Sequence, residues 1–276
     1  METAPVQYAI VDGAVEEGLL DFLNEVNPPH CCLYAEPIQP DLVALAPYLV
    51  EVVPEVEAWL RDKASPWGIY LTTYSTMNVL RQHLRRYLQV LIPDETKPVL
   101  LRFYDPRNIW DFLSVLSEWE QHIFLYNIQS IATFYQTKEF ESFSELHKKY
   151  PDSGVIKKKL IVINKDQYKN LEIISQEKYI NSLTTFMTEL SDKDPIICYR
   201  WARELFYHFC ELNIVDRRSI ECLTILMIGS KIYNVHDIPL NYQEILSDTN
   251  TPGHYRAERL LLSIYGKIPS WRRESK

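Results

Sequence analysis

Glycine is scarce in this chain, with seven glycines among 276 residues. Phosphate-binding loops depend on closely spaced glycines, because only glycine lets the backbone approach a phosphate group so closely. The sequence contains neither the G-x-G-x-x-G pattern of dinucleotide-binding folds nor the G-x-x-x-x-G-K pattern of nucleotide hydrolases. We therefore expect a protein that needs no cofactor.

Long apolar runs are also missing. A membrane-spanning helix needs roughly 18 or more consecutive apolar residues, and the longest uncharged stretches, such as residues 64–80, are interrupted by Pro, Ser, Thr and Asn. The first residues show neither the basic nor the apolar segment of a secretory signal. We expect no contact with a membrane and a location in the cytoplasm.

Paired cysteines are absent. The five cysteines are widely spaced, and no Cys-x-x-Cys motif occurs: they are Cys31, Cys32, Cys198, Cys210 and Cys222. Zinc sites and disulfide frameworks use ligands at short, regular spacing. The pattern favours buried thiols in a reducing compartment and no metal, and a zinc site built from scattered Cys and His is the alternative.

Positive charge is missing from the first 60 residues, which contain eleven Asp and Glu residues but no Lys or Arg. Nucleic-acid-binding domains carry a basic face or stripe, whereas the dense basic clusters here are confined to residues 157–159 and 272–273. We therefore expect no nucleic-acid partner. An acidic N-terminal segment instead suits a basic surface on a protein partner, where opposite charge speeds association.

The first half of the chain alternates between strand and helix patterns. The spacing of apolar residues predicts strands at 8–11, 32–34, 48–53, 67–73, 99–104 and about 127–135. It predicts helices at 15–26, 54–63, 76–91 and from 105–106 through 119. This alternation indicates an α/β lobe, a mixed sheet with flanking helices.

The second half is mainly helical. One short strand is predicted at 160–163, followed by helices at 165–171, 175–190, 195–212, 217–233, 240–246 and 252–265. The last helix has Thr251 as its expected N-cap and Gly266 just beyond its end. Because the character changes in the polar stretch 137–159, we predict an α/β lobe over residues 1–136 and a mainly α-helical lobe over residues 137–276.

Three side chains are candidates for chemistry. Asp12 ends the first predicted strand, where it is either a turn residue or part of a ligand site. His83 lies on the flank of an apolar helix face, as a partly buried, hydrogen-bonded histidine or as a base. Asp105 precedes Pro106 as a helix N-cap would. With no G-x-S-x-G or H-E-x-x-H motif in the sequence, we predict no enzyme, the alternative being one that uses these three residues on a small molecule.

The stretch from Arg102 to Arg107 offers candidates for contact with a partner. In a strand, Arg102 and Tyr104 share one side, while Leu101 and Phe103 share the other and are expected in the core. The candidate partner-binding residues are Arg102, Tyr104, Arg107, His83 and Arg85.

Six short segments, taken together, carry a resemblance to a known family. They lie at residues 8–14, 33–34, 46–50, 67–69, 83–88 and 101–107. Their order and spacing resembles the N-terminal domain of bacterial type VI secretion effector adaptors, also called effector chaperones, over about residues 6–130. The family pattern near residues 121–126 often contains Gly and Pro, and this chain has neither there.

The resemblance implies a role in loading a secreted protein. Such adaptors bind a cognate toxic effector in the producing cell and help to mount it on the secretion spike, whose tip is VgrG. The family has no established catalytic residues, so none is carried over. We expect the helical lobe, or the cleft between the lobes, to grip the effector, and a structural subunit of the secretion machine is a further alternative.

Overall fold

A computed structural model of the chain describes residues 4–150 and 161–268. It divides into two compact units, Met1–Glu172 and Ile173–Lys276. The basic clusters at 157–159 and 272–273 lie outside the described residues. No helix within the described ranges combines the length and the apolar character that crossing a lipid bilayer requires.

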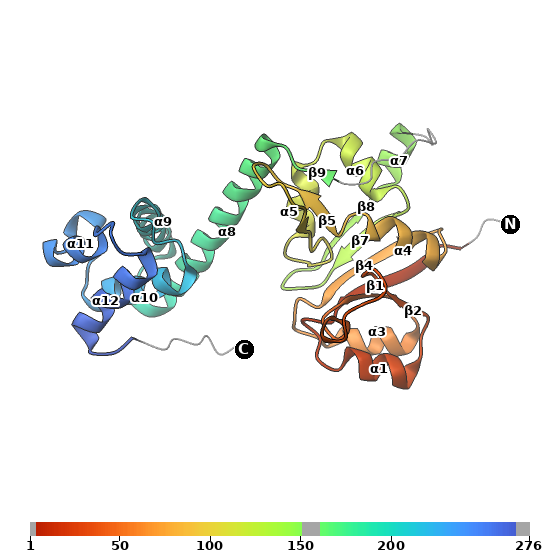
Figure 1. The fold of residues 1–276 in the computed structure, drawn as a ribbon, viewed down its shortest axis with the longest axis horizontal. Helices are drawn as coiled ribbons and strands as arrows, with labels where there is room; N and C mark the ends of the chain where they lie inside the picture. Colours follow the sequence, from red (N-terminus) through yellow and green to blue (C-terminus); the bar gives the residue numbers. More distant parts are fainter. Residues whose placement is uncertain (1–3, 151–160, 269–276) are drawn as a thin grey trace. The chain divides into compact units, whose positions relative to one another are not determined.

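The first unit is built on a six-stranded sheet in the order β2-β3-β1-β4-β7-β8 (Figure 1). The strands are β1 Val6–Asp12, β2 His30–Cys32, β3 Pro47–Glu51, β4 Gly68–Thr73, β7 Ser130–Thr133 and β8 Glu139–Ser142. Every neighbouring pair is antiparallel. The prediction of an α/β lobe with flanking helices is confirmed, but its large sheet is antiparallel and not mixed.

Mixed pairing occurs in a second, three-stranded sheet. Its strands are β6 Val99–Leu100, β5 Gln89–Leu91 and β9 Ile161–Val162. β5 pairs with β6 antiparallel and with β9 parallel. This small sheet joins segments that lie far apart in the sequence, which hides it from any analysis of local periodicity.

Helices cover both faces of the large sheet. Because successive side chains of a strand point to opposite faces, β1 contributes Tyr8 and Ile10 to one core and Ala9 and Val11 to the other. The helices α1 Leu19–Val26 and α3 Pro54–Arg61 pack on the second of these faces. The first face packs against α4 Met77–Arg85, α5 Ile109–Val115 and α6 Glu118–Leu125. Two short helices, α2 Pro40–Val43 and α7 Ser144–Lys149, complete the unit.

The predicted helix at 76–91 and the predicted strand at 99–104 end well before their predicted ends. The helix predicted at 76–91 ends at Arg85, because residues 89–91 pair with two other strands as β5. The strand predicted at 99–104 is limited to Val99–Leu100, because the following residues turn back toward the core.

The helix predicted from 105–106 through 119 is two helices, α5 and α6. The break lies at Ser117, whose hydroxyl accepts a hydrogen bond from the backbone N–H of Glu120 while the Glu120 carboxylate accepts from the Ser117 N–H. Such a capping box satisfies two backbone donors at the start of a helix. It therefore begins a new helix within the predicted one.

The second unit is helical, as predicted. Its elements are α9 Pro195–Glu211, α10 Arg217–Gly229, the 3-10 turn Val235–Asp237, α11 Leu240–Leu246 and α12 Gly253–Tyr265. Gly266 ends α12 in the left-handed conformation with φ 68, as expected, but the N-cap is Pro252 and not Thr251. The helices predicted at 165–171 and 175–190 are one continuous helix, α8 Lys165–Ser191.

The division between the units differs from the boundary predicted at residues 136/137. β8 pairs with β7, and β9 pairs with β5, so both strands belong to the first unit. The polar stretch 137–159 therefore carries an edge strand and α7 of that unit. Helix α8 begins in the first unit and ends in the second.

Gly68 provides a test of the central strand pairing. It has φ +154, and a Cβ atom there would lie 1.8 Å from the backbone carbonyl oxygen of Ile10 in β1. We expect Gly68→Ala to lower the free energy of unfolding by about 3 kcal/mol, because a backbone neighbour cannot rotate away. Gly18→Ala is the control, since Gly18 also has positive φ but open space around it, and should cost only about 1 kcal/mol. Equal losses in urea denaturation would contradict this account.

Candidate functional site

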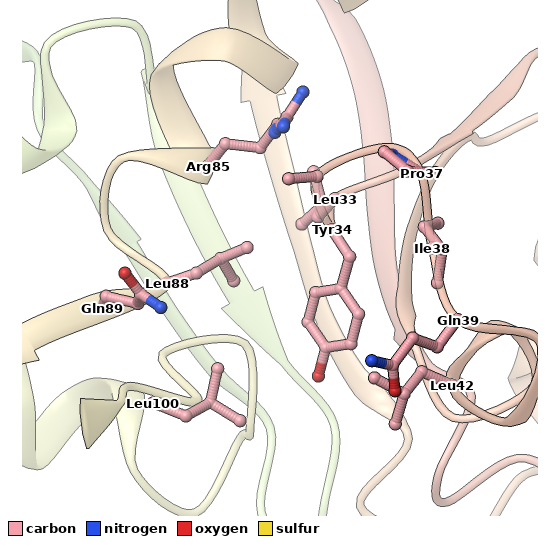
Figure 2. Close-up of a pocket in the computed structure, with 11 residues that line it drawn as sticks. Leu33, Tyr34, Pro37, Ile38, Gln39, Leu42, Arg85, Leu88, Gln89 and Leu100 are labelled. Carbon is pink, nitrogen blue, oxygen red and sulfur yellow. The ribbon is translucent and has the colours of Figure 1, made fainter. Parts of the chain in front are cut away.

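A groove of about 630 Å³ opens on the first unit (Figure 2). One wall follows β2 and continues into α2, with the side chains of Leu33, Tyr34, Pro37, Ile38, Gln39 and Leu42. The other wall comes from the end of α4 and the small sheet, with Arg85, Leu88, Gln89 and Leu100. Most of these side chains are aliphatic, and Arg85 is the one charged group among the described residues that line the groove.

The pairing of β5 with β6 sets the second wall. Gln89 lies opposite Leu100 in that pair, and the N–H of Leu101 donates to the carbonyl of Leu88 at 2.8 Å. Leu88 is buried at the base, whereas Leu100 is 52% exposed at the rim. On the other wall Leu42 is also at the rim, 41% exposed. The groove thus has an apolar base and an apolar rim.

Arg81 fastens the two walls together. Its Nε donates to the carbonyl of Cys32 at 2.8 Å, and its Nη2 lies 2.8 Å from the Glu36 carboxylate. Arg81 belongs to α4, the helix whose end carries one wall, and its partners lie at the end of β2 and in the segment that forms the other wall. Its bonds therefore connect the two walls of the groove. Contacts within the first unit therefore hold the groove in shape.

Arg85 has no such partner. Within the described residues it makes no ion pair and no side-chain hydrogen bond, and it is partly exposed at one end of the groove (Figure 2). It is the one predicted partner-binding residue that lines the groove.

Arg102 instead pairs with Asp12. The Asp12 carboxylate is almost fully buried, accepts from the Arg102 guanidinium, and also accepts from the backbone N–H of Ala14 at 3.0 Å. Asp12 thus ends β1 as a turn residue whose charge is neutralised within the chain. Burial acts to lower the pKa of Arg102, but attraction to Asp12 outweighs it and the pKa is raised.

Asp105 and Arg107 form a second pair. Arg107 donates to the Asp105 carboxylate through Nε at 2.9 Å, Nη2 at 2.6 Å and the backbone N–H at 3.0 Å. These bonds close a turn, so the prediction that Asp105 caps the next helix is wrong. The N-cap of α5 is Asn108, which makes no side-chain cap hydrogen bond.

Tyr104 and His83 are in the core and not on the surface. Tyr104 is 1% exposed in the core cluster against which Tyr34 packs, and burial raises its pKa far above the ordinary tyrosine value. His83 is buried, its Nε2 donates to the carbonyl of Phe124 at 2.7 Å, and burial lowers its pKa to about 4. Tyr104 therefore supports the groove from behind, through Tyr34.

Of the three residues of the enzyme alternative, Asp12 and Asp105 lie near each other, since Arg102 and Arg107 each interact electrostatically with both carboxylates, and His83 has different neighbours. Asp12 and Asp105 are each held by an arginine, while His83 contacts Phe124 and Tyr87. Across residues 4–150 and 161–268, no group of three or more His, Cys, Asp and Glu side chains is placed to hold a metal ion. Of the cysteines, Cys198 and Cys222 are buried and the other three are partly exposed.

Sequence reasoning missed most of the groove. Its aliphatic residues come from three segments, 33–42, 85–89 and 100, that look like ordinary core or loop positions in the sequence. Of the predicted partner-binding residues, Arg85 alone lines the groove. Its lack of an ion pair appears only in the fold, because the sequence does not distinguish a partnered arginine from an unpartnered one.

Residues 7–122 match the model of a family described as a domain of unknown function, DUF4123. The match includes all residues that line the groove and both Asp–Arg pairs. No curated protein and no solved structure matches the chain.

The Asp12–Arg102 pair should be important for stability. Arg102→Gln leaves the Asp12 carboxylate buried without its counter-charge. We expect the free energy of unfolding to fall by about 2 kcal/mol, less than for a fully buried pair, because the Arg102 side chain is 36% exposed. The double variant Asp12→Asn with Arg102→Gln should recover part of this loss. Lys148→Gln, which removes an exposed pair with Glu145, is the control and should change little; equal effects would contradict the prediction.

His83 should make stability depend on pH. Its pKa is about 4 in the folded chain, against the ordinary histidine value of 6.5, so the unfolded chain binds a proton first as the pH falls. The free energy of unfolding should therefore decrease from pH 6.5 toward pH 4, by up to about 3 kcal/mol from this group. His83→Gln keeps a donor for the Phe124 carbonyl and lacks the titration. The difference between the two chains in urea denaturation should shrink with falling pH, and a constant difference would refute the assignment.

Proposed function

We propose that this protein is an adaptor of the bacterial type VI secretion system. In this role it binds a cognate toxic effector in the cytoplasm of the producing cell and helps to load it onto the VgrG spike. The observation that carries the proposal is the DUF4123 match over residues 7–122. It covers all six segments whose order resembles the effector adaptors, and the family is known among such adaptors.

The groove supports a protein-binding role. Apolar side chains that remain exposed at its rim, such as Leu42 and Leu100, are the kind of surface that a protein partner buries. An acidic first segment would draw a basic partner surface toward the same unit.

The two Asp–Arg pairs fit a scaffold better than a reaction centre. In each pair the carboxylate is buried and accepts both a guanidinium and a backbone N–H, so both of its oxygens already bond within the chain and little of the group is open to a substrate. A general base needs a free lone pair within reach of a substrate proton. We therefore propose a function without catalysis or cofactor.

Deletion of the gene in the producing bacterium tests the proposal. We expect one toxin to disappear from the culture medium while VgrG is still secreted, because an adaptor serves one cargo and not the whole machine. The tagged full chain should recover that toxin and VgrG from cell extracts. His83→Ala, placed in the core, is the control: where it stays folded it should keep both partners, whereas an enzyme that uses His83 would lose turnover.

Two outcomes would contradict the proposal. One is recovery of neither a toxin nor a spike protein by the tagged chain. The other is loss of VgrG secretion together with all toxins in the deletion strain, which is the result expected for a structural subunit of the secretion machine.

A further inference from the structure

The groove is electrically asymmetric. The described residues that line it include no Asp or Glu, and Arg85 places a single positive charge at one end. The chain has a net charge of −8, and the opposite wall, residues 33–42, belongs to the first 60 residues, which contain no Lys or Arg. An acidic protein thus presents an apolar groove that ends in a cation.

The charge of Arg85 has no acidic partner among the residues that the structure describes. The neighbouring Arg81 is neutralised by Glu36 and also donates to the Cys32 carbonyl, whereas Arg85 makes no ion pair or side-chain hydrogen bond among the described residues. A cation in the last turn of α4 suits the helix dipole. Arg86, exposed at the C-cap, meets that need equally well, so the dipole does not explain why Arg85 lines the groove.

We infer that the groove binds a peptide segment of a protein partner in which bulky aliphatic side chains flank a single carboxylate. The aliphatic side chains would pack against Leu88 and between Leu42 and Leu100, and the carboxylate would accept paired hydrogen bonds from the Arg85 guanidinium. Such bidentate, charge-assisted bonds are stronger than neutral ones and fix orientation. This inference rests on the proposed function, and it names the chemistry that the adaptor recognises.

The polar side chains of the groove suit a peptide whose backbone groups are free to form hydrogen bonds, as in an extended segment or a turn. Gln89 and Gln39 lie on opposite walls (Figure 2), and each amide carries both a donor and an acceptor for peptide backbone groups. A volume of about 630 Å³ lies within the range of sites that enclose drug-sized ligands. It therefore accommodates a few side chains of a segment and not a whole domain.

Binding of synthetic peptides to the full chain tests the inference. The probes are acetylated and amidated hexapeptides of leucine and alanine with one Asp at each position in turn, and the same set with Asn or Lys in its place. The methyl signals of Leu42 and Leu100 report whether a probe occupies the groove. We expect the best Asp probe to bind in the millimolar range or tighter and about tenfold more strongly than its Asn counterpart.

Single substitutions show whether the Arg85 guanidinium recognises the carboxylate of the peptide. Arg85→Gln should remove the preference for Asp over Asn, and Arg85→Glu should reverse it in favour of Lys. Arg86→Gln, on the next residue of the helix end, is the matched control and should keep the preference. Melting temperatures of the three variants should stay close to that of the parent chain, because neither arginine is buried.

Three results would overturn the inference: equal binding of Asp and Asn probes, a preference that survives Arg85→Gln, or no shift of the Leu42 and Leu100 methyls with any probe at millimolar concentration. These results are separable from failure of the proposed function. If the peptides fail while the parent and Arg85→Glu chains recover the same toxin and VgrG equally well, the adaptor role stands and the groove is not its contact.

Discussion

Asp12 is the residue on which the first unit most depends. It ends β1 between β3 and β4, and its N–H donates to the carbonyl of Trp67 while its own carbonyl accepts from Val15. Its buried carboxylate takes the N–H of Ala14 and the guanidinium of Arg102. Because an unpaired buried carboxylate costs several kcal/mol, the central strand can end here only if residue 102 is brought to it.

That requirement places the segment around Arg102 and, through it, one wall of the groove. Arg102 is held by Asp12, and Tyr104, two residues on, lies in the core cluster against which Tyr34 packs. Tyr34 in turn lines the groove. The chain just before Arg102 forms β6, which carries Leu100 to the rim. The stretch that resembles the adaptor family therefore lies mostly beneath the surface, where it supports one wall of the groove.

The sequence predicts the helices of this protein better than its sheets. Helices such as α9 and α11 follow from local spacing of apolar residues, which a single segment contains in full. β5 and β9 depend on partners about 70 residues apart, 90–91 with 161–162, and no local pattern encodes that pairing. The error at Asp105 has a local cause: its carboxylate accepts from Arg107, two residues on, in a turn that precedes α5.

The candidate site, like the fold, has a part that the sequence indicates and a part that it does not. Residues singled out for their chemistry, Asp12, His83 and Asp105, prove to be satisfied inside the fold, because polar groups in a core must find partners. The groove arises where three remote segments leave aliphatic side chains uncovered, and that outcome is set by packing. Arg85 is the one residue that the sequence predicts as a partner-binding residue and that the structure places in the groove.

The edge strand β8 of the large sheet differs from the groove in charge, and the difference favours the groove as a docking surface. β8 is exposed along its length, but Glu139 and Glu141 alternate with Phe140 on it, and charges on an edge strand discourage pairing with another chain. The groove has the opposite arrangement, with aliphatic side chains unguarded by acids and a cation at one end. A segment that pairs with β8 would meet its carboxylates, whereas an aliphatic segment with its own carboxylate meets its complement in the groove and not at β8. The sign of one charge is thus enough to separate the two surfaces.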